Sequence, residues 1–181
     1  MRTIRTIVRI YKFSELSDKA KEAAKQEYRE AFGYAWSSES LNSLEALAKH
    51  FDGKMVDYQI DWFGNDLSRA DFEMAEMPPD DIAAKLAELG TFDPETLEGY
   101  GDCKLTGYCH DESAIDGFRK AFQGPRRGVT NLHTLMYAAF KSWLAACQED
   151  CKDQFSDEQF DETCEANNWE FRADGTLQLG S

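Results

Sequence analysis

The segment NLHTLMYAAFKSWLAACQ, residues 131–148, carries the strongest helical pattern of the 181-residue chain. Apolar side chains recur in it at steps of three and four residues, the spacing that places them on one face of a helix. These side chains belong to Leu132, Leu135, Met136, Ala139, Phe140, Trp143, Leu144 and Cys147. Because other elements must cover so continuous an apolar face, we expect this segment to form the central core helix.

Shorter helices are predicted on both sides of this segment. Ser17 and Ser156 each precede a run of apolar residues at helical spacing, and a serine hydroxyl can cap the first turn of a helix. Gln159, three residues after Ser156, is placed to complete a capping box. The expected helices cover residues 17–32, 38–51, 80–89, 115–122 and 156–164.

Strands are predicted where the apolar spacing changes to two residues. Residues 4–12 alternate in this way and are rich in Ile, Val and Tyr. A polar segment separates two further strand candidates, near residues 56–62 and 71–74, so we expect them to pair as a hairpin. The side chains expected on the buried face of the first of these are Val56, Tyr58, Ile60 and Trp62.

The end of the chain predicts a second hairpin. NNWEFRADGTLQL, residues 167–179, contains Asp174-Gly175, a dipeptide typical of tight hairpin turns. We also expect a loop over residues 91–102 and a short strand over residues 103–110.

The order of these elements favours an α+β fold. Strands and helices do not alternate regularly, as they would in a doubly wound sheet. We therefore expect an antiparallel sheet, formed by the N-terminal strand, the central hairpin and the C-terminal hairpin, packed against about six helices. With 42% hydrophobic residues the chain can bury a normal core, and we expect residues 1–181 to form a single domain.

The chain is strongly acidic, with a formal net charge of −14 and an isoelectric point of about 4.6. A field of this sign repels nucleic acids and anionic membranes and attracts basic protein surfaces. No apolar run approaches the ~18 residues that a membrane-spanning helix needs. We therefore expect a cytoplasmic protein that binds neither nucleic acid nor membrane directly.

The excess of acid belongs to two blocks. Residues 57–102 hold 13 acidic and 2 basic residues, and residues 149–181 hold 10 acidic and 2 basic residues. We predict that the partner-binding surface is drawn from the acids of residues 57–81 and 149–165. The candidates are Asp57, Asp61, Asp66, Asp71, Glu73, Glu76, Asp80, Asp81, Glu149, Asp150, Asp153, Asp157, Glu158, Asp161 and Glu162.

Three interpretations of the first block are open. Solvent and salt can screen the exposed carboxylates, because the Debye length is ~8 Å at physiological ionic strength. A basic partner can neutralise them, since rows of carboxylates can imitate the spaced phosphates that fill the groove of a nucleic-acid-binding protein. A divalent cation is the third interpretation, although the spacing of a calcium loop is absent. Its ligands would be Asp57, Asp61, Asp66 and Asp71.

The cysteines give two further candidate sites. Five cysteines cannot all pair, and we expect reduced thiols. Cys109, His110, Cys147 and Cys151 offer the ligand types of a zinc site, but Cys147 continues the apolar face of residues 131–148, which favours a buried thiol.

A cysteine nucleophile needs an imidazole base close by. Cys103 or Cys109 with His110 or His133 is the material for such a pair, and no local catalytic signature accompanies it. We therefore expect no enzymatic activity, no cofactor and no metal.

Two segments resemble a group of small phage and prophage proteins. IYKFSELSDKAKEAAKQEYRE, residues 10–30, is similar to their opening strand and F-x-E-L-S-x-x-A-K helix start. FSDEQFDETCEANNWEFRADGTL, residues 155–177, is similar to their closing helix and hairpin. Together these segments cover about a quarter of the chain. The shared motifs belong to the scaffold and contain no catalytic residue, and some members of the group are associated with antitoxins.

The resemblance implies a phage accessory protein that acts in the cytoplasm of the bacterial host. Such proteins often disarm host defences, and inhibitors of CRISPR or restriction systems are commonly small, acidic and non-enzymatic. We therefore expect an inhibitor that binds the basic nucleic-acid-binding surface of a host defence complex by nucleic-acid mimicry. The alternative is an antitoxin-like protein that neutralises a partner toxin mainly through apolar contacts. The oligomeric state has no signal in the sequence.

Overall fold

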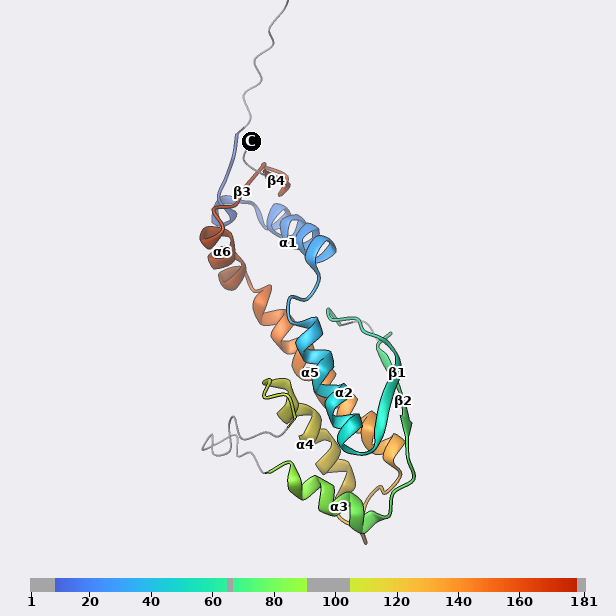
Figure 1. Cartoon of the computed structure of the whole chain (residues 1–181). Helices are drawn as coiled ribbons and strands as arrows, with labels where there is room; N and C mark the ends of the chain where they lie inside the picture. The colour runs from blue at the N-terminus through green and yellow to red at the C-terminus, as the bar shows by residue number, and fades with distance from the viewer. Residues whose placement is uncertain (1–8, 65–66, 91–104, 179–181) are drawn as a thin grey trace, which may run out of the picture. The chain divides into compact units, whose positions relative to one another are not determined.

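The computed structural model describes residues 9–64, 67–90 and 105–178 (Figure 1). The described residues form six α-helices, one short 3-10 helix and two antiparallel two-stranded sheets. The predicted α+β class with about six helices is therefore confirmed. None of the helices in these ranges is both long and apolar enough to cross a membrane.

The chain divides into two compact units. Unit 1 takes its described residues from 1–34 and 151–181, and unit 2 takes its described residues from 35–150. The expectation of a single domain stays a prediction.

Unit 2 contains the predicted core helix. Its elements in chain order are α2 (Ser37–His50), β1 (Gly53–Gln59), β2 (Arg69–Met74), α3 (Pro79–Glu88), α4 (His110–Phe122) and most of α5 (Leu132–Gln154). All eight apolar side chains that predicted α5 are buried. The helix that the spacing of residues 131–148 indicated is thus the one around which unit 2 packs.

Aromatic side chains join α2, α4 and α5. Phe51, which follows the last turn of α2, stacks on Phe118 of α4 with 4.3 Å between the ring centroids. Trp143 of α5 is fully buried, and its Nε1–H donates a 2.9 Å hydrogen bond to the carbonyl oxygen of Ser40 in α2. The buried indole is therefore satisfied without water.

Gly117 lets α4 approach α5 closely. A Cβ atom at this position would lie 2.5 Å from Ser142 Cβ and 2.7 Å from the carbonyl oxygen of Ala138. Ordinary carbon contacts are ~3.5–4 Å long, so a larger residue cannot fit unless the helices move apart. The crossing of α4 and α5 thus depends on a residue without a side chain.

The short strand expected over residues 103–110 is wrong for the part that the structure describes. Residues 105–109 form no strand, and His110 begins α4. The buried carboxylate of Asp111 accepts hydrogen bonds from the backbone N–H groups of Thr106 (2.9 Å), Gly107 (2.8 Å) and Tyr108 (3.2 Å). One side chain therefore satisfies the donors that a strand would offer to a neighbour. The loop expected over residues 91–102 and Cys103 lie outside the described residues.

The predicted central hairpin is confirmed, because β1 and β2 pair antiparallel. A bulge interrupts their register. Met55 is the Cα partner of Phe72 and Asp57 is the Cα partner of Asp71, so Val56 stands between two paired residues with no partner in β2. The extra residue shifts the alternation of β1 by one position.

The bulge corrects the predicted buried face of β1. Val56 and Tyr58 are each 47% exposed rather than buried, while Ile60 and Trp62 are half-buried and follow the end of β1. The bulge accounts for Val56, because a strict two-residue period holds only for a strand without a bulge. Tyr58 remains the Cα partner of the buried Ala70, so the register does not account for its exposure.

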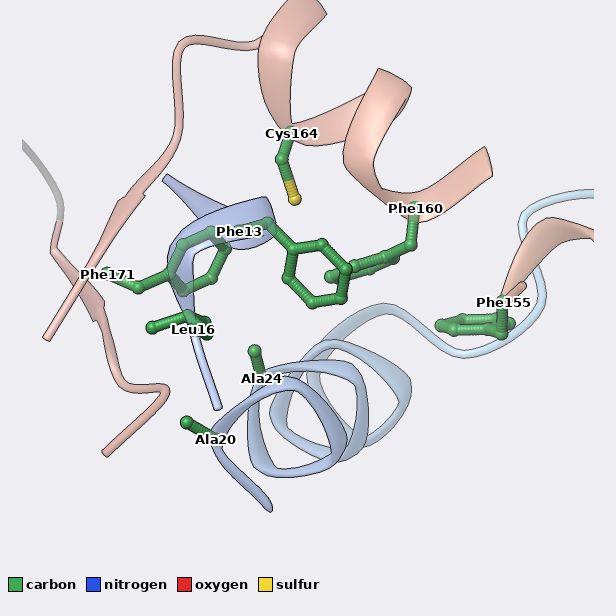
Figure 2. Close-up of a cluster of buried hydrophobic side chains, with 8 residues drawn as sticks. All are labelled: Phe13, Leu16, Ala20, Ala24, Phe155, Phe160, Cys164 and Phe171. Carbon is green, nitrogen blue, oxygen red and sulfur yellow. The ribbon is translucent and has the colours of Figure 1, made fainter. Parts of the chain in front are cut away.

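Unit 1 is built from the two ends of the chain. Its elements are η1 (Phe13–Glu15), α1 (Asp18–Phe32), the end of α5, α6 (Asp157–Ala166), β3 (Glu170–Phe171) and β4 (Leu177–Gln178). Both predicted serine caps are confirmed: Ser17 Oγ accepts the Ala20 N–H at 3.4 Å, and Ser156 Oγ accepts the Gln159 N–H at 3.3 Å. Figure 2 shows the core of this unit, formed by Phe13, Leu16, Ala20, Ala24, Phe155, Phe160, Cys164 and Phe171.

Phe13 connects the two ends of the chain in this core. Its ring meets Phe160 and Phe171 edge-on, at centroid distances of 4.9 and 6.1 Å. Tyr11 makes an isolated antiparallel bridge to Phe171 through two backbone hydrogen bonds of 2.9 Å. Residues 4–8 of the predicted first strand lie outside the described residues, and Tyr11 shows that its end pairs with the C-terminal segment.

The C-terminal hairpin is confirmed, with β3 antiparallel to β4. Asp174 Oδ1 accepts the Thr176 N–H at 3.0 Å, and Gly175 adopts a φ of 93°, a conformation that favours glycine. A Cβ atom on Gly175 would also collide with the carbonyl oxygen of Ala20. The turn therefore packs directly on the backbone of α1.

Candidate partner-binding surface

The exposed face of the β1–β2 hairpin carries both acids and bases. Asp57 and Asp71 are partners in the register, and so are Lys54 and Glu73. Lys54 Nζ lies 2.7 Å from Glu73 Oε2, and Arg69 Nη2 lies 3.0 Å from Asp57 Oδ2. The side chains in these two ion pairs are 57–66% exposed, so each pair contributes only ~0–1 kcal/mol and leaves the carboxylates open to a competing cation.

Asp61 has a structural role in the hairpin loop. Its Oδ1 accepts the Phe63 N–H at 3.0 Å, its backbone N–H donates to Ser68 Oγ at 2.8 Å, and its carbonyl oxygen accepts from Gln148 Nε2 at 3.0 Å. The last contact attaches the loop to α5. Asp61 therefore shapes the loop, and Asp66, the next candidate, lies outside the described residues.

The remaining acids of the first block follow one another from β2 into α3. We call residues 71–81 the acidic connector. It contains no Lys, Arg or His, and its five carboxylates are all exposed: Asp71, Glu73, Glu76, Asp80 and Asp81. Pro79 begins α3, so the last two stand in its first turn, where the helix dipole favours negative charge.

Four acids of the connector form no ion pair with a base that the structure describes. Within residues 9–64, 67–90 and 105–178, ion pairs engage Glu73 but not Asp71, Glu76, Asp80 or Asp81. Apart from Glu73, the acidic connector thus carries negative charge that is both exposed and not neutralised by the described bases.

Large apolar side chains are exposed on the same hairpin. They are Val56 and Tyr58, each 47% exposed, Phe63 at 41%, and Leu67 at 68%. Trp62 of the same loop contacts the buried Trp143 edge-on, with 5.7 Å between ring centroids. The loop is therefore anchored by Trp62 and presents Phe63 and Leu67 to solvent.

The second acidic block is divided between the two units. Glu149 and Asp150 belong to unit 2, whereas Asp153, Asp157, Glu158, Asp161 and Glu162 belong to unit 1. Because they fall in separate units, we treat the two parts as separate groups.

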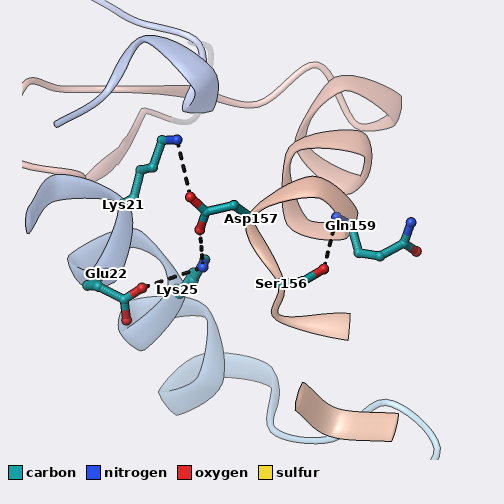
Figure 3. Close-up of polar contacts among 6 residues, drawn as sticks. All are labelled: Lys21, Glu22, Lys25, Ser156, Asp157 and Gln159. Atoms are coloured by element: carbon teal, nitrogen blue, oxygen red, sulfur yellow. Dashed lines mark hydrogen bonds and ion pairs between the residues drawn. The ribbon is translucent and has the colours of Figure 1, made fainter. Parts of the chain in front are cut away.

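Asp157 is engaged by bases of its own unit (Figure 3). It forms ion pairs with Lys21, at 3.3 Å, and with the buried Lys25, which also lies 3.5 Å from Glu22. The hydrogen bond from Lys25 is the main reason that the pKa of the Asp157 carboxyl is lowered. Asp157 thus ties the start of α6 to α1.

Two further acids of this group contact their own unit. Asp161 is half-buried and helps to raise the pKa of the buried Cys164 thiol to about 12, chiefly an effect of burial. Glu162 Oε2 accepts a 2.9 Å hydrogen bond from Gln159 Nε2. Asp153 and Glu158 are exposed.

The structure brings together part of the predicted zinc set. His110 Nδ1 lies 3.4 Å from Cys147 Sγ and 3.1 Å from Ser40 Oγ. All three residues are buried, and burial lowers the pKa of the His110 imidazole. This cluster is closed to solvent, so it acts as a polar contact within the core.

The other cysteines add no metal site in the described part of the chain. Cys109 is exposed, and partial burial raises the pKa of its thiol, which favours the unreactive protonated form. Cys151 belongs to unit 1. Among the described residues there is no group of three His, Cys, Asp or Glu side chains that could hold a metal ion.

Comparisons of the chain with protein-family models, with curated proteins and with solved structures found no match. The resemblance to phage and prophage proteins stays a hypothesis. Function is therefore inferred from the charges and contacts of the described residues.

Proposed function

We propose that this protein is a non-catalytic inhibitor that binds the basic nucleic-acid-binding surface of a host defence complex through its acidic connector. The observation that supports this proposal is the run of five exposed carboxylates over residues 71–81, with no base among them and four that form no ion pair within the described part of the chain. A basic channel that holds phosphates offers the complementary charge.

The mechanism is competition for the cationic surface. Exposed carboxylates accelerate encounter with a basic surface and exclude like-charged nucleic acid from it. The ion pairs of Asp57 and Glu73 are weak and exposed, so these two acids can exchange their internal partners for those of the target. Binding of this kind falls as salt is added.

The second acidic block supports binding less well. Asp157 is neutralised by Lys21 and Lys25, and Asp161 and Glu162 contact their own unit. We therefore assign partner binding to unit 2.

Charge reversal at matched positions tests this function. Asp71, Glu76 and Asp80 are changed to Lys in one variant, and the exposed helix acids Glu27, Glu30 and Glu45 are changed to Lys in the control. Both variants change the net charge equally. Tagged proteins are incubated with lysate of the bacterial host at low and high salt, and the captured protein is assayed for nucleic-acid binding.

We expect the connector variant to lose the partner and the control to keep it, with capture of a nucleic-acid-binding complex at low salt. Equal capture by the two variants contradicts the proposal.

The alternative function has one specific observation in its favour. Val56, Tyr58, Phe63 and Leu67 expose apolar surface on the hairpin, which suits an antitoxin-like protein that neutralises a toxin through apolar contacts. In that case binding persists at high salt, and Tyr58→Ser with Leu67→Ser abolishes capture while the connector variant retains it.

A further inference from the structure

A groove of about 770 Å³ runs beside the acidic connector in unit 2. One wall is the segment from the end of β2 to the start of α3, and the other is the segment that leads into α5. The lining residues are Met74, Ala75, Glu76, Met77 and Pro78 on the first wall and Thr130, Asn131, Leu132 and His133 on the second. Its volume lies within the range of ~300–1,000 Å³ typical of ligand sites.

We propose that this groove receives an arginine or lysine side chain carried on an extended segment of the basic partner. The inference rests on the proposed function and identifies the place on unit 2 where the partner is anchored. The occupant is a long cationic side chain.

The apolar part of the lining suits the stem of such a side chain. Met74 and Met77 contribute flexible thioethers, and Leu132 adds the apolar start of the α5 face. Arginine and lysine bury their methylene stems along apolar surfaces while the charged head stays in a polar environment. Methionine adapts its shape to such a stem at little cost.

The charge of the lining suits the head. Glu76 is exposed on the first wall, and the acids Asp80 and Asp81 follow Pro79 directly. No Lys or Arg is among the described residues that line the groove. A guanidinium or ammonium group at Glu76 therefore gains a charge-assisted hydrogen bond, and among the described residues that line the groove His133, on the opposite wall, is the one basic side chain.

The start of α5 forms the opposite wall and acts against this preference. A helix N-terminus favours anions, although Asn131 already supplies an acceptor there, because its Oδ1 accepts the Thr134 N–H at 3.1 Å. An anionic ligand is therefore the chemical alternative that the experiment has to include. A second copy of the chain is another, since it offers the exposed Arg126 and Arg127.

Three short peptides of identical length provide the probes: acetyl-Gly-Arg-Gly-Arg-Gly-amide, its citrulline counterpart and its glutamate counterpart. Citrulline keeps the shape of arginine and removes the charge. Each is titrated into the full chain, and backbone amide shifts are followed by NMR. We expect saturable shifts at Met74–Met77 and at Leu132–His133 with the arginine peptide, and weaker binding, by roughly tenfold, with citrulline.

Two variants test the lining. Glu76→Gln should lower the affinity for the arginine peptide by roughly three- to tenfold. Glu45 is an exposed acid on α2, and Glu45→Gln should leave this affinity unchanged. Ala75→Trp should block the groove without changing charge. The proposal is overturned if the glutamate peptide binds more tightly than the arginine peptide, or if the citrulline peptide binds as tightly as the arginine peptide. It is also overturned if the chain dimerises with rising concentration and Arg126→Ala with Arg127→Ala abolishes this dimerisation.

The two proposals fail separately. If the arginine peptide leaves the groove residues unshifted while Asp71, Glu76 and Asp80 reversal still abolishes capture of the partner, the anchor site is wrong and the proposed function stands. If the groove binds the arginine peptide but capture from the host does not depend on the connector, the proposed function is wrong.

Discussion

Asp57 and Asp71 are cross-strand partners in the β1–β2 ladder, so two carboxylates stand opposite each other on the exposed face of the hairpin. Like charges in directly opposite positions destabilise a strand pair. Arg69 lies 3.0 Å from Asp57 and compensates in part, while Asp71 has no ion pair among the described residues. The repulsion between the two carboxylates is thus only partly offset by the described bases.

Asp71→Asn should therefore stabilise the protein by roughly 0.5 kcal/mol, because it removes the repulsion without touching the Arg69–Asp57 pair. Asp57→Asn is the matched control, and it should stabilise less because the same change also removes that pair. Urea denaturation measures both. If Asp71→Asn lowers the free energy of unfolding, the two carboxylates do not repel each other significantly.

Gly117→Ala should destabilise the protein by about 1–3 kcal/mol through overpacking between α4 and α5. The added methyl would lie 2.5 Å from Ser142 Cβ and 2.7 Å from the Ala138 carbonyl oxygen. The sign of the change in the free energy of unfolding is diagnostic, because a Gly→Ala substitution inside a helix otherwise stabilises the protein by ~1 kcal/mol. Thermal and urea unfolding measure the change, and a stabilised variant would show that the two helices can separate freely.

The elements that could be predicted from the sequence are those in which local pattern and burial agree. All eight apolar residues that predicted α5 are buried, and the Ser17 and Ser156 caps form as predicted. The phase of β1 could not be predicted, because the bulge at Val56 depends on pairing with a distant strand. Asp111 likewise satisfies three backbone donors only after the chain before α4 has folded back on it.

The sequence predicts which residues of the surface are charged, but it does not predict which of them form ion pairs. The run of acids over residues 71–81 is visible in the sequence, whereas the contact between Lys25 and Asp157 joins residues far apart in the chain. Lys25 itself lies in a polar stretch of α1 that carries no sign of burial, yet its side chain is only 5% exposed. Tertiary contacts thus decide which acids remain available to a partner.

Asp157 should make the stability of the protein depend on pH in the acid range. The hydrogen bonds from Lys25 and Lys21 lower the pKa of its carboxyl below the ordinary value of 3.8, so its contribution to stability is present above that pH. The contribution is lost as the pH falls through the lowered pKa. Asp157→Asn should flatten this part of the pH profile.

Glu158→Gln is the control for this profile, since Glu158 is exposed and forms no ion pair in the described part of the chain. Asp157 is itself 56% exposed, so added salt should reduce the wild-type effect. Unfolding by urea at a series of pH values measures it. Identical profiles for wild type and Asp157→Asn would contradict the role of this ion pair.

His110 should make the protein less stable as the pH falls from neutrality. Burial lowers the pKa of its imidazole below the ordinary value of 6.5, although Asp150 and Asp111 act in the opposite direction. Between 6.5 and the lowered pKa the unfolded chain binds a proton that the folded chain resists, so the free energy of unfolding decreases with falling pH.

Because Ser40 and Cys147 lie against Nδ1 of His110, the variant His110→Asn will also change the overall stability. The quantity to compare is therefore the slope of the free energy of unfolding against pH. We expect a shallower slope for His110→Asn than for the wild type. A slope in His110→Asn equal to that of the wild type would mean that the buried imidazole accepts its proton without cost.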